Sequence, residues 1–257
     1  MMVNFHIVTD VKAIKPLFEK FHQSLLLTYW QGNIGYAYTD NALQPYSAVV
    51  NVGYFFFCAD CPNQDMLSYT PTIYNNNYFI VIADDQIWQS LIERTYPSSY
   101  QKFTRYSFYF EPLFEGQKLQ AIVSKLSEDY QLEAIDENNY QQITSLKWSK
   151  HLCNNFNAYS ALTKYGLGCV ILKDNINVSG ASSSLAYDNG IEREVDTLAQ
   201  QRWKGLGLIC SAKLILTCLV RQISPKWDAN NHAFLKMTTK LGFKPNKSYQ
   251  AYTILNS

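Results

Sequence analysis

The chain has 257 residues, 47% of them hydrophobic and 17% charged, with a formal net charge of +1. This composition supplies a core for one large domain or two small ones, and it lacks the basic face or charged run of a nucleic-acid-binding protein. The N-terminus shows no apolar signal segment, and the longest apolar run, about 206–220, is too short and too polar to span a bilayer. We therefore expect a cytoplasmic protein with neither a membrane nor a nucleic acid as partner.

The first 130 residues alternate between strand and helix patterns, an order that predicts a sheet covered by helices. Helical periodicity is clearest over 116–128, where apolar residues recur at i, i+3, i+4 and i+7. The helix predicted over 12–27 contains Pro16, which should lie near its start or else break it. The predicted helices are 12–27, 86–93 and 116–128, and the predicted strands are 46–57, 78–82 and 103–110.

A hairpin is predicted in the second half of the chain. Its strands are 177–187 and 191–197, preceded by a buried strand over 168–173. Between them, Asp188-Asn189-Gly190 predicts a type I′ turn, because Asn-Gly readily supplies the positive φ values that this turn requires. Small side chains over 180–184 leave room for a ligand or for another element that crosses the strand closely, and the sequence does not separate these two interpretations.

The hairpin leads into a segment typical of a phosphate site. A polar turn over 199–203 precedes Lys204-Gly205-Leu206-Gly207, and an apolar helix over 206–220 follows. The first N–H groups of a helix have no partner within it, and the helix dipole adds positive charge there, so this end attracts anions. Gly205 and Gly207 remove side chains that would keep a ligand off the backbone, and Arg202 and Lys204 add full charges.

The kind of phosphate site can be narrowed by spacing. No G-x-x-x-x-G-K-[ST] loop is present, and the dinucleotide fingerprint would need a third glycine at Cys210. What stands here is Arg202-x-x-Gly205-x-Gly207, which resembles the Q/R-x-x-G-x-G/A signature of GNAT-superfamily acetyltransferases. In that family the signature holds the pyrophosphate of acetyl-coenzyme A. Alone, the match is also compatible with an ordinary helix start.

The downstream sequence strengthens the resemblance. A short strand is predicted within 225–229, a helix over 231–241 and a last strand over 244–255. GNAT proteins follow the pyrophosphate helix with a strand, a helix that starts at asparagine and an "LGF" turn. Asn231 and Leu241-Gly242-Phe243 match this order. With Thr197, Arg202, Lys204 and Trp227-Asp228-Ala229, the pattern is similar to the branch that includes zwittermicin A N-acetyltransferase and bacterial relatives.

This resemblance implies the fold. We expect a mixed α/β (α+β) chain in which residues 131–257 form a GNAT domain with a mixed, splayed central sheet flanked by helices. Residues 1–130 form an N-terminal mixed α/β region, which would bind the acceptor or be a degenerate half-GNAT. The resemblance is good from about residue 167 to residue 252 and faint before that.

The resemblance also implies the cofactor-binding residues. Acetyl-coenzyme A is expected as co-substrate, held by main-chain groups near the end of strand 191–197, by the glycine loop and by Asn231. An N-terminal helix cap explains Asn231 as well, and the two roles can coexist. The residues expected to bind the cofactor are Val195, Thr197, Arg202, Trp203, Lys204, Gly205, Leu206, Gly207 and Asn231.

Two carboxylates on the strand before the loop are candidates for the chemistry. Glu192 and Glu194 lie two residues apart and therefore share one face of the strand. Acetyl transfer needs a neutral amine, and a carboxylate can remove its proton, often through water. Glu194 lies nearer the expected splay of the sheet and is our first choice as base. Ordinary solvated charges on an exposed strand face explain both residues equally.

One position departs from the family pattern. Many GNAT enzymes place a tyrosine four residues before the glycine of "LGF", as the acid that protonates the leaving thiolate. Here that position is Thr238. Another tyrosine, His232 or water would have to supply the proton, although His232 is also explained as a surface residue of a helix.

The six cysteines predict neither metal nor disulfides. Cys58 and Cys61 have C-x-x-C spacing, but no second Cys or His pair accompanies them, so a zinc site is not expected. We interpret them as ordinary thiols near a strand end, with a redox pair as the alternative. Cys210 and Cys218 fall on the apolar helix as small buried residues.

Two functions of different class follow from the sequence. The first is an N-acetyltransferase that moves an acetyl group from acetyl-coenzyme A to a primary amine of a small molecule by direct transfer. The second is a non-catalytic acyl-coenzyme A-binding module. The Glu192/Glu194 pair favours the enzyme, and Thr238 favours the module.

Overall fold

The computed structural model describes residues 5–69, 77–83, 85–109 and 114–255. The chain divides into two compact units. Unit 1 consists of Met1–Ser107, Asp228–Asn231 and Lys247–Ser257, and unit 2 of Phe108–Trp227 and His232–Asn246. The chain therefore returns to unit 1 twice after leaving it, once for a four-residue segment and once for the last strand.

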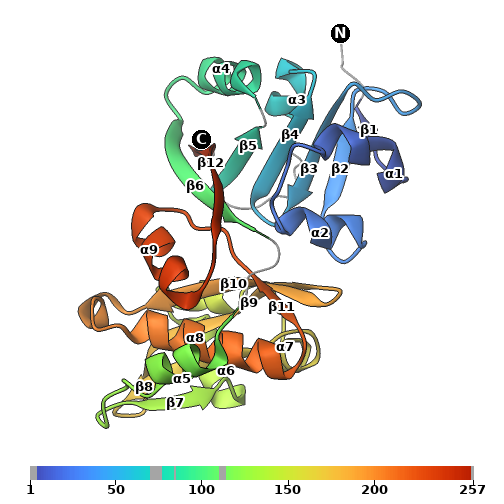
Figure 1. Ribbon diagram of the computed structural model, residues 1–257. Coiled ribbons are helices and arrows are strands. Elements are labelled where there is room, and N and C mark those ends of the chain that lie inside the picture. Colours follow the sequence, from blue (N-terminus) through green and yellow to red (C-terminus); the bar gives the residue numbers. More distant parts are fainter. Residues whose placement is uncertain (1–4, 70–76, 84, 110–113, 256–257) are drawn as a thin grey trace. The chain divides into compact units, whose positions relative to one another are not determined.

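Unit 1 is built on a seven-stranded mixed sheet, of order β1-β2-β3-β4-β5-β12-β6. Strands β4 and β5 pair parallel, and β12, the last strand of the chain, pairs antiparallel with β5 (Figure 1). The strands are β1 His6–Ile7, β2 Tyr36–Thr39, β3 Ser47–Val52, β4 Phe55–Asp60, β5 Tyr78–Ala83, β6 Tyr100–Phe108 and β12 Pro245–Leu255.

Short helices accompany this sheet. They are α1 Val11–Ile14, the 3₁₀ turn η1 Lys15–Phe18, α2 Leu25–Trp30, α3 Gln64–Ser68 and α4 Gln86–Thr95. The side chains of Trp88, Leu91 and Ile92 place one face of α4 in a core with the sheet residues Phe56, Val81 and others. This is the amphipathic pattern that predicts a helix there.

Two predictions for this region are wrong in detail. The segment 46–57 is not one strand, because the chain turns at Gly53, whose φ is +59°, and forms the antiparallel pair β3–β4. The segment 12–27 is not one helix: α1 ends at Ile14, η1 with Pro16 follows from Lys15, and α2 starts only at Leu25. The strand predicted over 103–110 is β6, although residue 110 lies outside the described residues.

Unit 2 is built on a five-stranded sheet of order β11-β10-β9-β8-β7. The pair β10–β11 is parallel, and the remaining pairs are antiparallel. The strands are β7 Gln131–Ala134, β8 Gly168–Lys173, β9 Ile176–Tyr187, β10 Gly190–Thr197 and β11 Ser224–Lys226. The helices are α5 Gly116–Val123, α6 Glu137–Ser145, η2 Lys150–Leu152, α7 Tyr159–Tyr165, η3 Ala199–Gln201, α8 Leu206–Val220 and α9 His232–Leu241.

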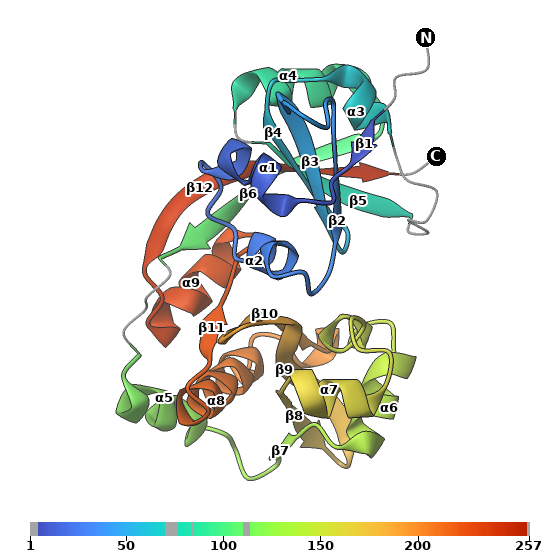
Figure 2. The same cartoon turned by 90° about the vertical axis from the view of Figure 1, so that its right-hand side faces the viewer.

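Helix α8 packs against strands β8, β9 and β10 and against α5 and α9 (Figure 2). Elements η2 and α6 contact β9 and share a core with α7. Because α8 is covered on several sides, eight of its residues are buried, as its nearly uniform apolar sequence predicts. The fold is thus mixed α/β, as expected, with a sheet flanked by helices.

The hairpin β9–β10 differs from its prediction in the turn. Tyr187 pairs with Gly190, so only Asp188 and Asn189 form the loop. Of these residues Asn189 alone has a positive φ, +61°, whereas a type I′ turn needs two successive positive values. The predicted turn type is therefore wrong, although the antiparallel pairing that follows it is confirmed.

Candidate active site

The sheet of unit 2 splays at β10. Strand β11 pairs with β10 only from Gly190 to Glu192, where Glu192 lies opposite Lys226. Strand β10 continues to Thr197 with β9 on its other side. From Arg193 onward, one edge of β10 is therefore not paired with β11, and its main chain can hydrogen-bond a ligand there.

The two faces of β10 have different neighbours. Ser182, opposite Glu194, donates a hydrogen bond to the carbonyl of Leu152 in η2. On the other face, Thr197 lies opposite Ser179, and their hydroxyl oxygens are 2.8 Å apart. Ser179 in turn contacts Cys210 of α8. From Arg193 onward, alternation therefore places Glu194 on the η2 face and the loop-side residues on the α8 face. The register shift between Glu192 and Arg193 interrupts the alternation, so the face of Glu192 does not follow from that of Glu194.

The predicted carboxylates differ in burial. Glu192 is 5% exposed and stands at the last pair between β10 and β11, whereas Glu194 is half-buried in the splayed part of β10. Asp196, which is not among the predicted catalytic residues, shares the face of Glu194, since it lies two residues beyond it. Burial raises the pKa of Asp196 above its ordinary range, against the effect of a hydrogen bond from the N–H of Thr197.

The small residues of β9 serve packing. A Cβ on Gly180 would lie 2.7 Å from Cδ1 of Leu152, so η2 crosses β9 closely at this point. The sequence left open whether these small residues make room for a ligand or for another element, and at Gly180 the structure shows another element, η2.

The glycine loop has the geometry of an anion site. Gly205 is the N-terminal flanking residue of α8 with a φ of +82°, and no side chain caps this helix end. A Cβ on Gly205 would meet no atom within 4 Å. A Cβ on Gly207 would lie 3.2 Å from Oγ1 of Thr197 and 3.5 Å from Cγ2 of Val195, so a glycine lets α8 start directly against β10.

The basic residues beside this helix start are exposed. Arg202 donates a hydrogen bond from Nε to the carbonyl of Thr197 at 3.1 Å, and its Nη2 is 3.9 Å from Oδ1 of Asp196. Lys204 donates to Oε1 of Gln201 at 2.7 Å. Arg202 is thereby held at the end of β10, with Val195, Thr197 and Gly207 nearby. The structure thus brings these predicted binding residues together.

Trp203 stands out in this loop. It is 92% exposed and has a φ of +67°, a left-handed conformation that is unfavourable for a bulky side chain. Strain of this kind is often retained at ligand-binding sites.

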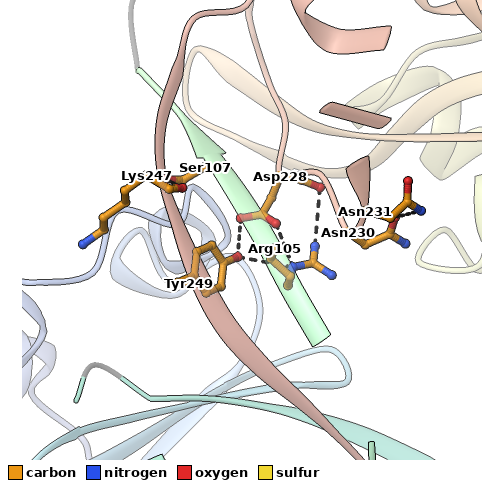
Figure 3. A network of polar contacts seen from close by, with 7 residues as sticks. All are labelled: Arg105, Ser107, Asp228, Asn230, Asn231, Lys247 and Tyr249. Carbon is orange, nitrogen blue, oxygen red and sulfur yellow. Dashed lines mark hydrogen bonds and ion pairs between the residues drawn. The ribbon is translucent and has the colours of Figure 1, made fainter. Parts of the chain in front are cut away.

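The segment after β11 is anchored in unit 1. Oδ1 of Asp228 accepts a hydrogen bond from Nε of Arg105 at 2.7 Å, and its Oδ2 accepts one from Tyr249, all from buried or half-buried side chains (Figure 3). The next residues include Asn231, whose Nδ2 donates to Oδ1 of Asn230 at 2.8 Å. Asn231 belongs to unit 1, and its approach to a cofactor stays a prediction.

Thr238 does not replace the missing acid. It is fully buried, and its hydroxyl donates to the carbonyls of Phe234 and Leu235, within its own helix α9. His232 is exposed at the first residue of α9.

Sequence reasoning also missed Arg193, a buried arginine in the splayed strand. The sequence feature that could have pointed to Arg193 is a charged residue between Glu192 and Glu194, in a strand where neighbouring residues face opposite sides.

The described residues include no helix long and apolar enough to cross a membrane. The same residues contain no cluster of three or more histidine, cysteine, aspartate or glutamate side chains arranged to hold a metal ion. All six cysteines are free thiols.

The loop fits the diphosphate of coenzyme A. An uncapped helix start supplies N–H donors, glycines at 205 and 207 keep the backbone open, and two exposed cations stand beside it. The unpaired edge of β10 offers main-chain groups to an extended arm such as pantetheine.

Comparison with known proteins identifies the family. The family model described as GNAT acetyltransferase matches residues 15–252. A protein of Bacillus subtilis (strain 168), "Uncharacterized N-acetyltransferase YdfB", is 25% identical over 227 residues, which are 85% of each chain. A GCN5-related N-acetyltransferase-like protein from Streptococcus suis 89/1591 superposes with a TM-score of 0.88 at 35% identity, covering 95% of this chain and 98% of that one.

A more distant structure shares the fold alone. A tandem GNAT protein from the clavulanic acid biosynthesis pathway has a TM-score of 0.51 at 9% identity, and the match covers 98% of both chains. The family match spans most of the chain, and GNAT proteins use acetyl-coenzyme A as co-substrate. The chain belongs to the GNAT acetyltransferase family and is an acyltransferase of the GNAT type.

Proposed function

We propose that this protein transfers an acetyl group from acetyl-coenzyme A directly to a primary amine of a small molecule, as a relative of the zwittermicin A N-acetyltransferase branch. The observation that carries the proposal is the uncapped start of α8, which lies with its two glycines against the splayed half of β10. There the loop from Arg202 to Gly207 binds the diphosphate. Val195 and Thr197 are positioned beside the pantetheine arm.

Glu194 is the proposed base. It lies in the splayed part of β10, on the face opposite α8, so an amine approaching from that face reaches its carboxylate. The amine nitrogen attacks the thioester carbon, its proton passes to Glu194 directly or through water, and the C–S bond breaks with its electron pair on sulfur. Glu192, which is more deeply buried at the last β10–β11 pair, is the second candidate carboxylate.

Unit 1 is proposed to shape the acceptor site. The fold match with a tandem GNAT protein over 98% of both chains supports a degenerate half-GNAT origin for the N-terminal region. A small molecule with a primary amine, such as a natural product or metabolite, is the acceptor class that we favour.

Cofactor binding is tested by a matched pair of variants. Gly205→Asp places a carboxylate against the diphosphate and should weaken the affinity for coenzyme A at least about tenfold. Gly53→Asp is the control, because Gly53 also has a positive φ and open space around its Cβ but lies in the β3–β4 turn. Calorimetric titration with coenzyme A should separate the two variants. Equal affinities in both would contradict the loop assignment.

Catalysis is tested by thiol release from acetyl-coenzyme A with a panel of primary amines. Glu194→Gln should lower kcat by roughly a hundredfold or more, with little change in coenzyme A affinity. Glu192→Gln should have the smaller effect. If the protein binds coenzyme A but acetylates no amine of the panel, the result would favour the non-catalytic module. Thr238 supports that alternative, because it stands where many GNAT enzymes have the acid tyrosine and its hydroxyl is bonded within α9.

A further inference from the structure

Arg193 is a buried cation with an incomplete set of partners. The residue is only 4% exposed. Its Nε donates one hydrogen bond to the carbonyl of Lys226 at 3.3 Å. Its Nη1 and Nη2 atoms are buried and have no hydrogen-bond partner. Within the described residues, no carboxylate forms an ion pair with it. Four N–H groups thus point into the interior without an acceptor.

Aromatic rings enclose this guanidinium. Its Cζ lies 4.2 Å from the ring centre of Trp227 and 4.5 Å from that of Phe243. Burial lowers the pKa of Arg193 from its ordinary value, and three nearby groups act in the opposite direction, namely Cys218 of α8, Glu192 of β10 and Tyr187 of β9. A buried guanidinium whose Nη groups have no hydrogen-bond acceptor is costly, so its retention calls for a functional reason.

The place of Arg193 suggests that reason. It is the first residue of β10 beyond the last pair with β11, and it faces α8, as Val195 and Thr197 do. Glu194 occupies the opposite face. In an acyl transfer the amine side needs a base, whereas the leaving-group side needs a positive charge or a proton. Thr238 offers neither, because its hydroxyl is bonded within α9.

We propose that Arg193 is the leaving-group residue of this enzyme, and that its Nη groups donate hydrogen bonds to the coenzyme A sulfur as it departs. This inference rests on the proposed acetyl transfer. When the amine nitrogen bonds to the acetyl carbon, the C–S bond breaks and the electron pair goes to sulfur. The thiolate then accepts hydrogen bonds from Arg193 until it takes a proton from solvent, while the amine proton leaves through the carboxylate face.

The buried surroundings of the Arg193 guanidinium have to change when the thioester binds. Because both Nη atoms are buried, side chains around the guanidinium must shift when the thioester sulfur reaches it. In this dry surrounding a hydrogen bond to a thiolate is stronger than in water. A substitution that removes the guanidinium should therefore act on the sulfur and leave the rest of the cofactor unaffected.

Binding affinities for coenzyme A and for desulfo-coenzyme A, which lacks the sulfur, distinguish a contact between Arg193 and the sulfur from a purely structural role of Arg193. Wild-type protein and Arg193→Met should bind desulfo-coenzyme A equally, whereas Arg193→Met should bind coenzyme A roughly tenfold more weakly than wild type at alkaline pH. In the wild-type complex the thiol should titrate at least about one pH unit below free coenzyme A, as measured by thiolate absorbance. Arg193→Met should abolish that shift, and Arg193→Lys should retain part of it.

Controls keep the outcomes distinct. Arg221→Met removes an exposed arginine at the end of α8 and should change neither affinity nor the thiol titration. If Arg193→Met does not fold, the titration of the bound thiol in wild type and in Arg193→Lys still decides. An unshifted thiol in wild type, or an equal shift in Arg193→Met, overturns the role of Arg193 while coenzyme A binding stands. Failure of wild type to bind either ligand overturns the proposed function itself.

Discussion

Asp228 and Arg105, which are 123 residues apart in sequence, form a buried ion pair in which Nε donates to Oδ1 at 2.7 Å. The side chains are only 5% and 9% exposed. Burial alone would lower the pKa of Arg105, but the Asp228 carboxylate, together with Tyr249 and Tyr54, outweighs it and raises that pKa. The pair secures the segment Asp228–Asn231 on β6, where Ala229 also bridges to Tyr106 through two backbone hydrogen bonds.

Removal of one partner of this pair should destabilise the protein strongly. Asp228→Asn or Arg105→Met leaves an uncompensated buried group and should lower the free energy of unfolding by about 3–5 kcal/mol. Urea denaturation followed by circular dichroism measures the difference. Lys102→Met is the control, because Lys102 pairs with Glu93 at 2.9 Å but both side chains are about 40% exposed, and such pairs contribute about 0–1 kcal/mol. If Lys102→Met lowers the free energy of unfolding as much as the substitutions at Asp228 and Arg105 do, burial does not explain the contribution of the Arg105–Asp228 pair to stability.

The sequence predicted the elements around the loop better than those of unit 1. The helix over 206–220 and the strand over 168–173 agree with α8 and β8 at both ends, because apolar runs and a glycine loop bound them. In unit 1, the β3–β4 turn was missed because the strand pattern continues through Gly53. No local pattern distinguishes a glycine in a turn from one in a strand when apolar residues flank both sides.

The candidate site was predictable where one short segment forms it. Arg202, Gly205 and Gly207 lie together because they are near neighbours in the chain. The environment of Arg193 was not predictable, since its enclosure depends on Trp227 and Phe243, which come from other segments. The same holds for the ion pair of Asp228, because its partner Arg105 lies 123 residues away in the sequence.

Trp203 should have opposite effects on stability and on binding. Its φ of +67° is unfavourable for a bulky side chain. Trp203→Gly should therefore raise the free energy of unfolding by roughly 0.5–1 kcal/mol, after the added chain entropy of glycine is subtracted. On the proposed function, the same change should weaken coenzyme A binding, because an exposed ring beside the diphosphate loop is lost.

Asn189→Gly is the control for this pair of effects. Asn189 has a φ of +61° but lies in the β9–β10 turn, so glycine there should leave coenzyme A affinity unchanged. Thermal unfolding and calorimetric titration of both variants provide the comparison. If Trp203→Gly binds coenzyme A as tightly as wild type does, Trp203 is not a binding residue.

Two histidines should make stability depend on pH near neutrality. Burial, followed by a nearby lysine in each case, lowers the pKa of His22 and of His151 from 6.5. In the unfolded chain both take up protons at higher pH than in the folded protein. The free energy of unfolding should therefore be highest above about pH 6.5 and fall as the pH decreases below it.

The double variant His22→Gln/His151→Gln should reduce this slope between about pH 7 and pH 5.5, where carboxylates contribute least. The exposed His6 provides the control substitution, His6→Gln. Urea titrations at closely spaced pH values measure the slope. A slope that the double variant leaves intact would assign the effect to other groups.

The cysteines should differ sharply in reactivity. Burial raises the pKa of the Cys153 thiol to about 12 and that of the Cys218 thiol to about 11, and it also raises the pKa of Cys210. Cys58 is buried in β4, and Cys61 alone of the six is exposed. Since the thiolate is the reactive form and must also be accessible, one cysteine should react rapidly with iodoacetamide in the native protein. Mass spectrometry should find the modification on Cys61, and Cys61→Ser should abolish the rapid phase. Rapid modification of Cys58 together with Cys61 would instead support the redox pair that their C-x-x-C spacing left open.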